Sequence, residues 1–294
     1  MNSSGGRITV RGFNIYFRYF KADNAGGKRK GTVVCLHGGP GATHDYLLPM
    51  TDLVSEGYEV LLYDQLGCGK SELPKNIALF TIENGVEELE ELRRKLKLGK
   101  IHLMGSSYGG LLAIAYALKY QKNLRSIITE GGVASVPLAS SEMQCLKRLL
   151  PASIRTVLEK YENSGEYTNP EYLRAVEVFY RRHVCRLKEW PAELVYSLEH
   201  ISAPVYNTMN GPNEFTIIGN IRYWDVSGSL HGIGVPAFVT GGKYDEVTPA
   251  VAKHIHDGIP DSVLKIFPNS SHLPMWEERE KFLSAVSGFL DSTC

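Results

Sequence analysis

Short apolar runs recur along the chain and are separated by segments in which apolar residues follow a helical spacing. Such runs are typical of strands that are buried on both faces of a sheet. The predicted strands span residues 7–10, 14–19, 32–36, 59–63, 101–104, 126–129, 237–240 and 263–267. The first two flank Arg11, Gly12 and Phe13, and we expect them to form a hairpin.

Helical patterns alternate with these strands. Apolar residues between 86 and 96 lie on one face of a segment whose other face carries Glu and Lys, whereas 111–120 is apolar on all sides. A further amphipathic pattern covers 277–290. Strands that alternate with helices predict an α/β fold, in which helices cover both faces of a mostly parallel, eight-stranded sheet.

The alternation stops between about residues 135 and 229, where the pattern is helical and unusually aromatic. The aromatic residues there are Tyr161, Tyr167, Tyr172, Phe179, Tyr180, Trp190, Tyr196, Tyr206 and Phe215. Because neither edge is a low-complexity run, we predict an insertion within one α/β domain. The predicted organisation is a first core part over 1–134, a helical cap over 135–229 and a second core part over 230–294. The aromatic residues either line an apolar pocket under this cap or only pack the cap onto the core.

Composition excludes several classes of partner. The 294 residues carry 32 Lys+Arg and 32 Asp+Glu, so no field of one sign is available to hold nucleic acid. The N-terminus lacks an apolar signal segment, and no apolar run approaches the roughly 20 residues of a membrane span. Five scattered cysteines without a C-x-x-C pair predict reduced thiols in a cytoplasmic protein, with neither a metal nor another cofactor.

A strand, a tight turn and a helix are predicted to meet at residues 105–109 (Gly-Ser-Ser-Tyr-Gly). The G-x-S-x-G pattern places a nucleophilic serine on a strained turn between strand and helix. Only Ser107 has the small residues two positions before and after it that this turn requires; Ser106 does not. We therefore predict that Ser107 is the nucleophile, next to the positive end of the following helix.

A glycine-rich loop, residues 37–41 (His-Gly-Gly-Pro-Gly), follows the strand at 32–36. In folds with this serine turn, one N–H of such a loop and the N–H after the nucleophile bind the oxyanion of the intermediate. The predicted donors are the backbone N–H groups of Gly39 and Tyr108. A simple Gly/Pro turn is the alternative for this loop.

Residues 67–71 (Gly-Cys-Gly-Lys-Ser) resemble the end of a phosphate-binding loop, but that motif needs glycine where Asp64 stands. Asp64 also precedes Ser107, which is the wrong order for the acid of a catalytic triad in this fold. We expect Asp64 to organise its own turn.

The predicted acid and base follow the nucleophile in the chain. Asp245 lies just beyond the strand at 237–240 and before a helix expected to start at Pro249, with Glu246 as the competing acid. His272 lies on a loop beyond the strand at 263–267. We predict that His272 takes the proton of the nucleophile and that Asp245 orients His272 and offsets its charge.

Taken together, these motifs resemble those of the proline iminopeptidases, aminopeptidases with the α/β-hydrolase fold, and closely those of the archaeal tricorn-interacting type. The resemblance covers nearly the whole chain and includes residues 211–216 (Gly-Pro-Asn-Glu-Phe-Thr) in the insertion. The His-Gly-Gly-Pro-Gly loop is its most specific part. Gln65 stands where members typically carry Arg, as in the archaeal variant.

The resemblance implies removal of an N-terminal residue, often proline, from short peptides that have a free N-terminus. The matching family positions that bind the substrate amine are Glu214 and Glu246 here, and two acids would supply strong charge-assisted hydrogen bonds. From the residues alone, Glu214 would be interpreted as a solvated surface charge. The resemblance also suggests a functional link to a larger upstream protease.

Two other functions are compatible with these residues. An amino-acid amidase or esterase would use the same triad without needing Glu214 or Glu246. A non-catalytic binding module is disfavoured because all three triad positions hold competent residues. Dehalogenases and epoxide hydrolases are excluded because they need a carboxylate where Ser107 stands.

Overall fold

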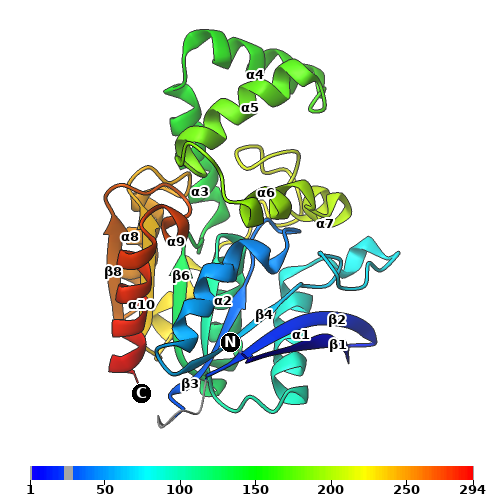
Figure 1. The fold of residues 1–294 in the computed structure, drawn as a ribbon. Coiled ribbons are helices and arrows are strands. Elements are labelled where there is room, and N and C mark those ends of the chain that lie inside the picture. Colours follow the sequence, from blue (N-terminus) through cyan, green and yellow to red (C-terminus); the bar gives the residue numbers. More distant parts are fainter. Residues whose placement is uncertain (1, 23–28, 294) are drawn as a thin grey trace.

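The computed structural model describes residues 2–22 and 29–293, and its eight strands form one sheet (Figure 1). The strands are β1 (Asn2–Val10), β2 (Phe13–Lys21), β3 (Gly31–Leu36), β4 (Tyr58–Tyr63), β5 (Ile101–Ser106), β6 (Leu124–Glu130), β7 (Ala237–Gly242) and β8 (Ser262–Phe267). Their order is β1-β2-β4-β3-β5-β6-β7-β8. β2 is antiparallel to both of its neighbours and every other pair is parallel, so the predicted mostly parallel sheet is confirmed.

The predicted hairpin of β1 and β2 is confirmed, with a turn shorter than the sequence suggested. Its central residues are Arg11 and Gly12, with φ of 50° and 87°. Positive φ at both positions gives a two-residue turn whose twist matches that of the strands. Phe13 therefore belongs to β2 and pairs with Val10.

Helices cover both faces of the sheet (Figure 1). One apolar core includes side chains of α1 (Ile82–Lys95), α2 (Tyr108–Tyr120) and α8 (Pro249–Gly258). The other includes side chains of the 3₁₀ segment η1 (His44–Val54) and of α10 (Arg279–Ser292). Alternate residues of β3 point into the two cores. Because both faces are covered, every residue of β4, β5 and β7 is buried, which explains their continuous apolar runs.

Five α-helices connect β6 to β7: α3 (Val136–Arg148), α4 (Ala152–Ser164), α5 (Pro170–His183), α6 (Ala192–Glu199) and α7 (Ala203–Met209). In Figure 1, α4 and α5 lie farthest from the sheet, with α3, α6 and α7 between them and its edge. Local signals explain α5, because Asn169 caps its start, Pro170 fits its first turn and basic residues end it. The division at residues 135 and 229 stays a prediction.

Aromatic residues of these helices pack against one another. Tyr161 and Tyr172 meet edge to face with ring centroids 6.3 Å apart, and Phe179 and Phe215 lie 4.8 Å apart. All four are buried. These four side chains therefore pack the inserted segment itself.

The predicted helix over 277–290 is observed as α10, and a short helix, α9 (Pro274–Glu277), precedes it. Glu278 separates the two, because its φ of −132° and ψ of 48° lie outside the helical region. The break lets α9 follow the loop that carries His272. Over residues 2–22 and 29–293, none of the helices combines the length and apolar character that crossing a bilayer requires.

Candidate active site

Ser107 lies on the turn between β5 and α2, with φ 58° and ψ −124°. A Cβ on Gly105 would lie 2.0 Å from the Gly109 oxygen, and one on Gly109 would lie 2.2 Å from the Leu36 oxygen. Only glycine fits at these two positions, as the motif predicts. Ser107 is partly accessible, whereas both of its chain neighbours are buried. The turn therefore presents this one side chain at the carboxyl edge of the sheet.

Asp245 and His272 come from the loops after β7 and β8 and meet as a hydrogen-bonded pair. His272 Nδ1 lies 2.6 Å from Asp245 Oδ1, which also accepts the Val247 N–H at 2.8 Å. Burial opposes a charge on the imidazole, but the Asp245 carboxylate outweighs it and raises the pKa of His272 well above its usual value. Asp245, rather than its competitor Glu246, is thus placed to orient the ring.

His272 and Ser107 both line a cavity of about 50 Å³. Nε2 is buried and has no hydrogen-bond partner within residues 2–22 and 29–293. An adjoining cavity of about 40 Å³ shares Ser107, Gly39, Glu214 and Glu246 with the first. The structure therefore gathers the predicted nucleophile, base, loop glycine and both glutamates around one connected space.

The glycine-rich loop forms one wall of this space. Gly39 has φ 107°, and a Cβ there would lie 2.7 Å from the Gly41 nitrogen, so glycine is required. Gln65 holds the start of the loop, since its N–H donates to His37 Nε2 at 3.0 Å and its side chain to the His37 carbonyl at 2.8 Å. Tyr108, the first residue of α2, lies in the same wall, where helix N–H groups have no partner within the helix.

Glu214 and Glu246 both line this space and come from different parts of the chain, Glu214 from the segment after α7 and Glu246 from the loop after β7. Glu214 Oε1 accepts a hydrogen bond from the Tyr206 hydroxyl at 2.8 Å. Glu246 Oε1 lies 3.8 Å from His272 Nε2, and its Oε2 is buried without a partner in the described part of the chain. Burial raises the pKa of both carboxyls, and the charge of Glu214 raises that of Glu246 further.

The smaller cavity is aliphatic on its far side. Its apolar lining consists of Leu111, Val133, Val136, Ala139, Met143, Ile217, Ile221 and Val247. At roughly 10–15 Å³ for each enclosed water, it has room for only a few heavy atoms. None of the aromatic residues of the insertion lines it. The space suits a small apolar group next to Ser107.

His183, the last residue of α5, joins the inserted helices to both catalytic loops. Its carbonyl accepts the N–H groups of Glu246 and His272, both at 3.2 Å. Its Nδ1 lies 2.9 Å from the Tyr244 carbonyl. The sequence pattern gave no sign of this contact, since a backbone carbonyl is present in every residue, nor of the Tyr206 contact with Glu214.

The remaining candidates lie away from the cavity. Asp64 organises its own turn as expected: Oδ1 accepts the His44 N–H at 2.9 Å and Oδ2 accepts the Lys70 N–H at 2.9 Å. Two other histidines follow Ser107 in the chain and lie on α8, where His254 contacts Ser227 and His256 contacts Ser262. Neither competes with His272.

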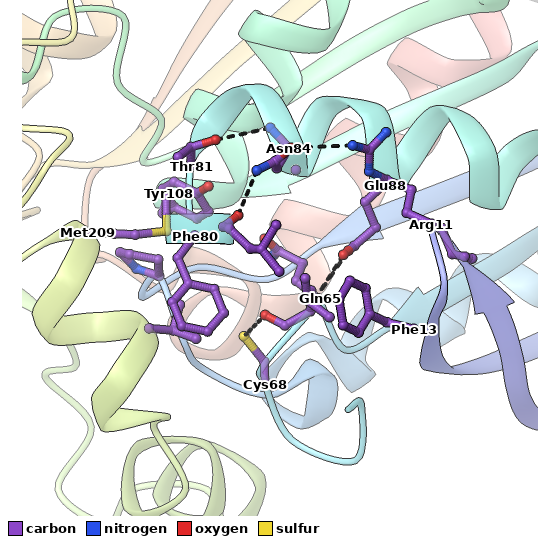
Figure 2. A pocket seen from close by; sticks show the side chains of 16 residues that line it. Arg11, Phe13, Gln65, Cys68, Phe80, Thr81, Asn84, Glu88, Tyr108 and Met209 are labelled. Atoms are coloured by element: carbon purple, nitrogen blue, oxygen red, sulfur yellow. Dashed lines mark hydrogen bonds between the residues drawn. The ribbon is translucent and has the colours of Figure 1, made fainter. Parts of the chain in front are cut away.

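Tyr108 also lines a separate pocket of about 100 Å³ (Figure 2). Arg11, Phe80, Asn84 and Glu88 line it, together with residues of the β1–β2 hairpin and α7. Glu88 is buried and accepts the Leu66 N–H, and burial raises its pKa to about 8. The pocket contains none of the predicted triad residues.

Similarity to known proteins identifies the class of protein to which this chain belongs. A family model described as alpha/beta hydrolase fold matches residues 31–279, so the chain is an α/β hydrolase. A proline iminopeptidase of Saccharolobus solfataricus is 49% identical over 293 residues, covering 99% of this chain and 93% of that protein.

Two solved structures with similar sequences support membership of the same family. The crystal structure of a proline iminopeptidase from Mycobacterium smegmatis is 34% identical, covers 99% of this chain and 98% of that chain, and superposes with a TM-score of 0.92. The crystal structure of VinJ is 38% identical, covers 99% of both chains and gives a TM-score of 0.94. The chain belongs to the proline iminopeptidase family.

Proposed function

We propose that this chain is a serine aminopeptidase that releases N-terminal proline, and other small apolar residues, from short peptides. The observation that carries the proposal is the position of Glu214 and Glu246 on the same cavity as Ser107 and His272. Two carboxylates in an enclosed space suit a cationic group, and the free N-terminus of a peptide is such a group. Family membership supports the same conclusion.

The aliphatic cavity sets the class of first residue. A pyrrolidine ring or a short aliphatic side chain fits its size and its lining of Leu, Val, Ile, Ala and Met. With the amine held by Glu214 and Glu246, the carbonyl of the first residue lies next to Ser107. Only one residue is accommodated before the bond that is cleaved, which makes the enzyme an exopeptidase.

In the proposed reaction, Ser107 Oγ attacks the carbonyl carbon of the first peptide bond while His272 Nε2 takes its proton. The oxyanion is stabilised by the N–H groups of Gly39 and Tyr108. His272 then protonates the leaving nitrogen, and the shortened peptide departs. Water, activated by the same imidazole, hydrolyses the acyl-enzyme and frees the amino acid. Asp245 offsets the imidazolium charge in both halves.

The raised pKa values of Glu214 and Glu246 are consistent with this role. Without substrate, burial and mutual repulsion favour a bound proton on this pair. An ammonium or pyrrolidinium group reverses this preference, because each carboxylate then forms a charge-assisted hydrogen bond. Binding of a cationic substrate is therefore coupled to release of a proton from the pair.

Fluorogenic aminoacyl amides test the proposal. We expect the proline amide and small aliphatic amides to be cleaved, and the same amides with a blocked amine to be cleaved at least about 100-fold more slowly, the factor for losing a charged hydrogen bond in an enclosed site. Equal rates on free and blocked substrates would contradict an aminopeptidase and indicate the esterase or amidase alternative.

The proposal extends to the setting of the enzyme. Short peptides with free N-termini are products of larger proteases, so the chain would act downstream of such an enzyme. The unpaired Cys35, Cys68, Cys145 and Cys185 support a reducing, cytoplasmic location. The helices between β6 and β7, assigned to residues 135–229, would act as the cap of this site.

A further inference from the structure

Glu130, the last residue of β6, lies directly behind the serine turn and has no place in the mechanism above. Its side chain is fully buried, and Oε2 accepts a hydrogen bond from the Ser106 hydroxyl at 2.5 Å. Its backbone carbonyl accepts the Ser107 N–H at 2.8 Å. Its Oε1 is buried and has no hydrogen-bond partner among the described residues. One acidic residue therefore contacts both serines of the turn.

The contact continues from Ser106 to the glycine-rich loop. The Tyr46 hydroxyl accepts the Gly38 N–H at 2.6 Å and lies near the Ser106 side chain. Because the single proton of Ser106 is donated to Glu130, the Ser106 oxygen can accept the Tyr46 proton. Tyr46, Ser106 and Glu130 are all buried. In this arrangement the donors run in one direction, from the Gly38 N–H through the hydroxyls of Tyr46 and Ser106 to the carboxyl group of Glu130. The bonds of such a hydrogen-bond chain strengthen one another cooperatively.

Gly38 connects this hydrogen-bond chain to the residues of the active site. A Cβ on Gly38 would lie 2.8 Å from the Ser107 Cβ and 2.9 Å from the backbone carbonyl oxygen of Ser106. The backbone of Gly38 is therefore in close contact with the turn that carries Ser107. The next residue is Gly39, the proposed oxyanion donor. A shift of Gly38 moves the Gly39 N–H relative to Ser107.

We propose that Glu130 and Tyr46 are positioning residues for acyl transfer: they hold the Gly39 N–H at a fixed distance from Ser107. This rests on the proposed function only as far as Ser107 is the nucleophile. Neither residue touches the substrate carbonyl in this scheme. Their effect is on the position of the oxyanion donor, where errors of about 1 Å cost up to about 100-fold in rate.

The charges around Glu130 explain why an uncharged acid suits this place. The titratable groups that face it are Tyr46 from η1, Asp245 from the loop after β7, His272 from the loop after β8 and Glu277 from α9. Burial raises the pKa of Glu130 to about 8, and the Asp245 charge adds to this. Above pH 8 the added negative charge opposes the oxyanion and holds more His272 in its protonated form.

The test is a double-mutant cycle between two members of this hydrogen-bond chain. Tyr46→Phe removes the hydroxyl in the middle, and Glu130→Leu removes the acceptor at the end. We expect each to lower kcat about tenfold and to change KM less than about twofold, since a fraction of an ångström is lost at the oxyanion donor and not at the amine site. The double variant should be no slower than the slower single variant, because both break one chain.

Tyr63→Phe is the matched control, because the Tyr63 hydroxyl is also buried and has no partner among the described residues. It takes no part in the hydrogen-bond chain of Tyr46, Ser106 and Glu130. It should keep the wild-type kcat. Thermal unfolding of every variant separates a loss of folded protein from a loss of rate. If Glu130→Leu does not fold, Tyr46→Phe alone still decides the effect on kcat.

Glu130→Gln keeps an acceptor for Ser106 and removes the ionisation. We expect near wild-type kcat/KM at pH 6.5 to 7, and a ratio of wild type to variant that falls as pH rises through about 8. The substrate amine titrates equally in both assays and cancels in this ratio. A purely structural role would leave the ratio constant.

Unchanged kcat in Tyr46→Phe, losses that multiply in the double variant, or a constant ratio through pH 9 would each overturn the proposal. These outcomes are distinct from failure of the aminopeptidase assignment. If the wild type cleaves an ester and no aminoacyl amide, the proposed function fails, and the same cycle on the ester still tests the positioning role.

Discussion

The turns at the carboxyl edge of the sheet and the helices inserted between β6 and β7 contribute different parts of the site. The turns hold Ser107, Asp245 and His272, the groups proposed to break and form bonds. The inserted segment supplies Glu214, which lines the same cavity, while Glu246 comes from a core turn. The proposed triad thus lies entirely in the core turns. The proposed amine site, which selects the substrate, is shared between the two regions.

The two regions are nevertheless joined at His183. Its carbonyl holds the N–H groups of Glu246 and His272, so the end of α5 fixes the loops that carry the amine site and the base. α6 makes a second connection, since the Ser197 hydroxyl lies 2.8 Å from that of Thr43 at the start of η1. Movement of the inserted helices would therefore alter the core turns as well as the opening of the cavity.

The largest effect is expected from Ser107→Ala, which removes the nucleophile from the core. We expect kcat to fall by about 10⁴- to 10⁶-fold, as for other serine nucleophiles, with unfolding unchanged. Ser284→Ala, at an exposed position of α10, is the control. Hydrolysis that survives Ser107→Ala would place the chemistry elsewhere and end the division between the two regions.

A smaller, substrate-dependent effect is expected from the amine site. Glu214→Gln and Glu246→Gln should each lower kcat/KM by about 100-fold on free-amine amides, because one charge-assisted bond in an enclosed site is lost. On an N-blocked ester, both should act like wild type. Glu166→Gln, an exposed change in the same inserted segment, should have no effect on either substrate. Equal losses on free and blocked substrates would mean that these carboxylates serve the triad instead.

His183→Ala tests the connection between the regions. The variant keeps the carbonyl but loses the contact of Nδ1 with the Tyr244 carbonyl, which steadies the helix end. We expect about a tenfold loss of kcat/KM, shared between kcat and KM because both loops move. His200→Ala, an exposed histidine at the end of α6, is the control from the same segment. A loss confined to KM would show that α5 affects only the amine site.

The smallest effect on activity is expected from Glu88→Gln, which alters the core away from both regions of the site. The folded-state pKa of Glu88 is about 8, above its unfolded value of about 4.3, so its contribution to stability is complete below about pH 4 and is lost as pH rises through 8. The variant should raise the free energy of unfolding at pH 8 by about 1–3 kcal/mol and leave kcat/KM unchanged.

Denaturant unfolding at pH 5 and pH 8 checks this. The wild type should lose stability between the two, and Glu88→Gln should lose less, with the remainder due to the other buried carboxyls whose pKa is raised, among them Glu130, Glu214 and Glu246. Equal pH dependence in both proteins would show that Glu88 is ionised in the fold.

Much of the fold could be predicted because its signals are local. All eight strands appear near their predicted positions, since a strand buried on both faces needs a continuous apolar run. The C-terminal helix was predicted within about two residues of its observed bounds. The short α9 before it was not predicted, because the break at Glu278 depends on the path of the neighbouring loop and not on periodicity. The aromatic insertion was harder, since aromatic residues that pack a helix pair and those that line a pocket give the same pattern.

The sequence by itself determined the sheet, the Ser107 turn and the loops that carry Asp245 and His272. Each depends on residues a few positions apart, and a parallel sheet brings the carboxyl ends of its strands to one edge. Only the tertiary structure decided which Asp245 oxygen meets His272, that Glu214 lines the cavity, and that the Ser106 hydroxyl meets Glu130 while the Tyr46 hydroxyl meets the Gly38 N–H. Those contacts join distant residues through ordinary hydroxyl, carboxyl and backbone groups, whose partners no local pattern specifies.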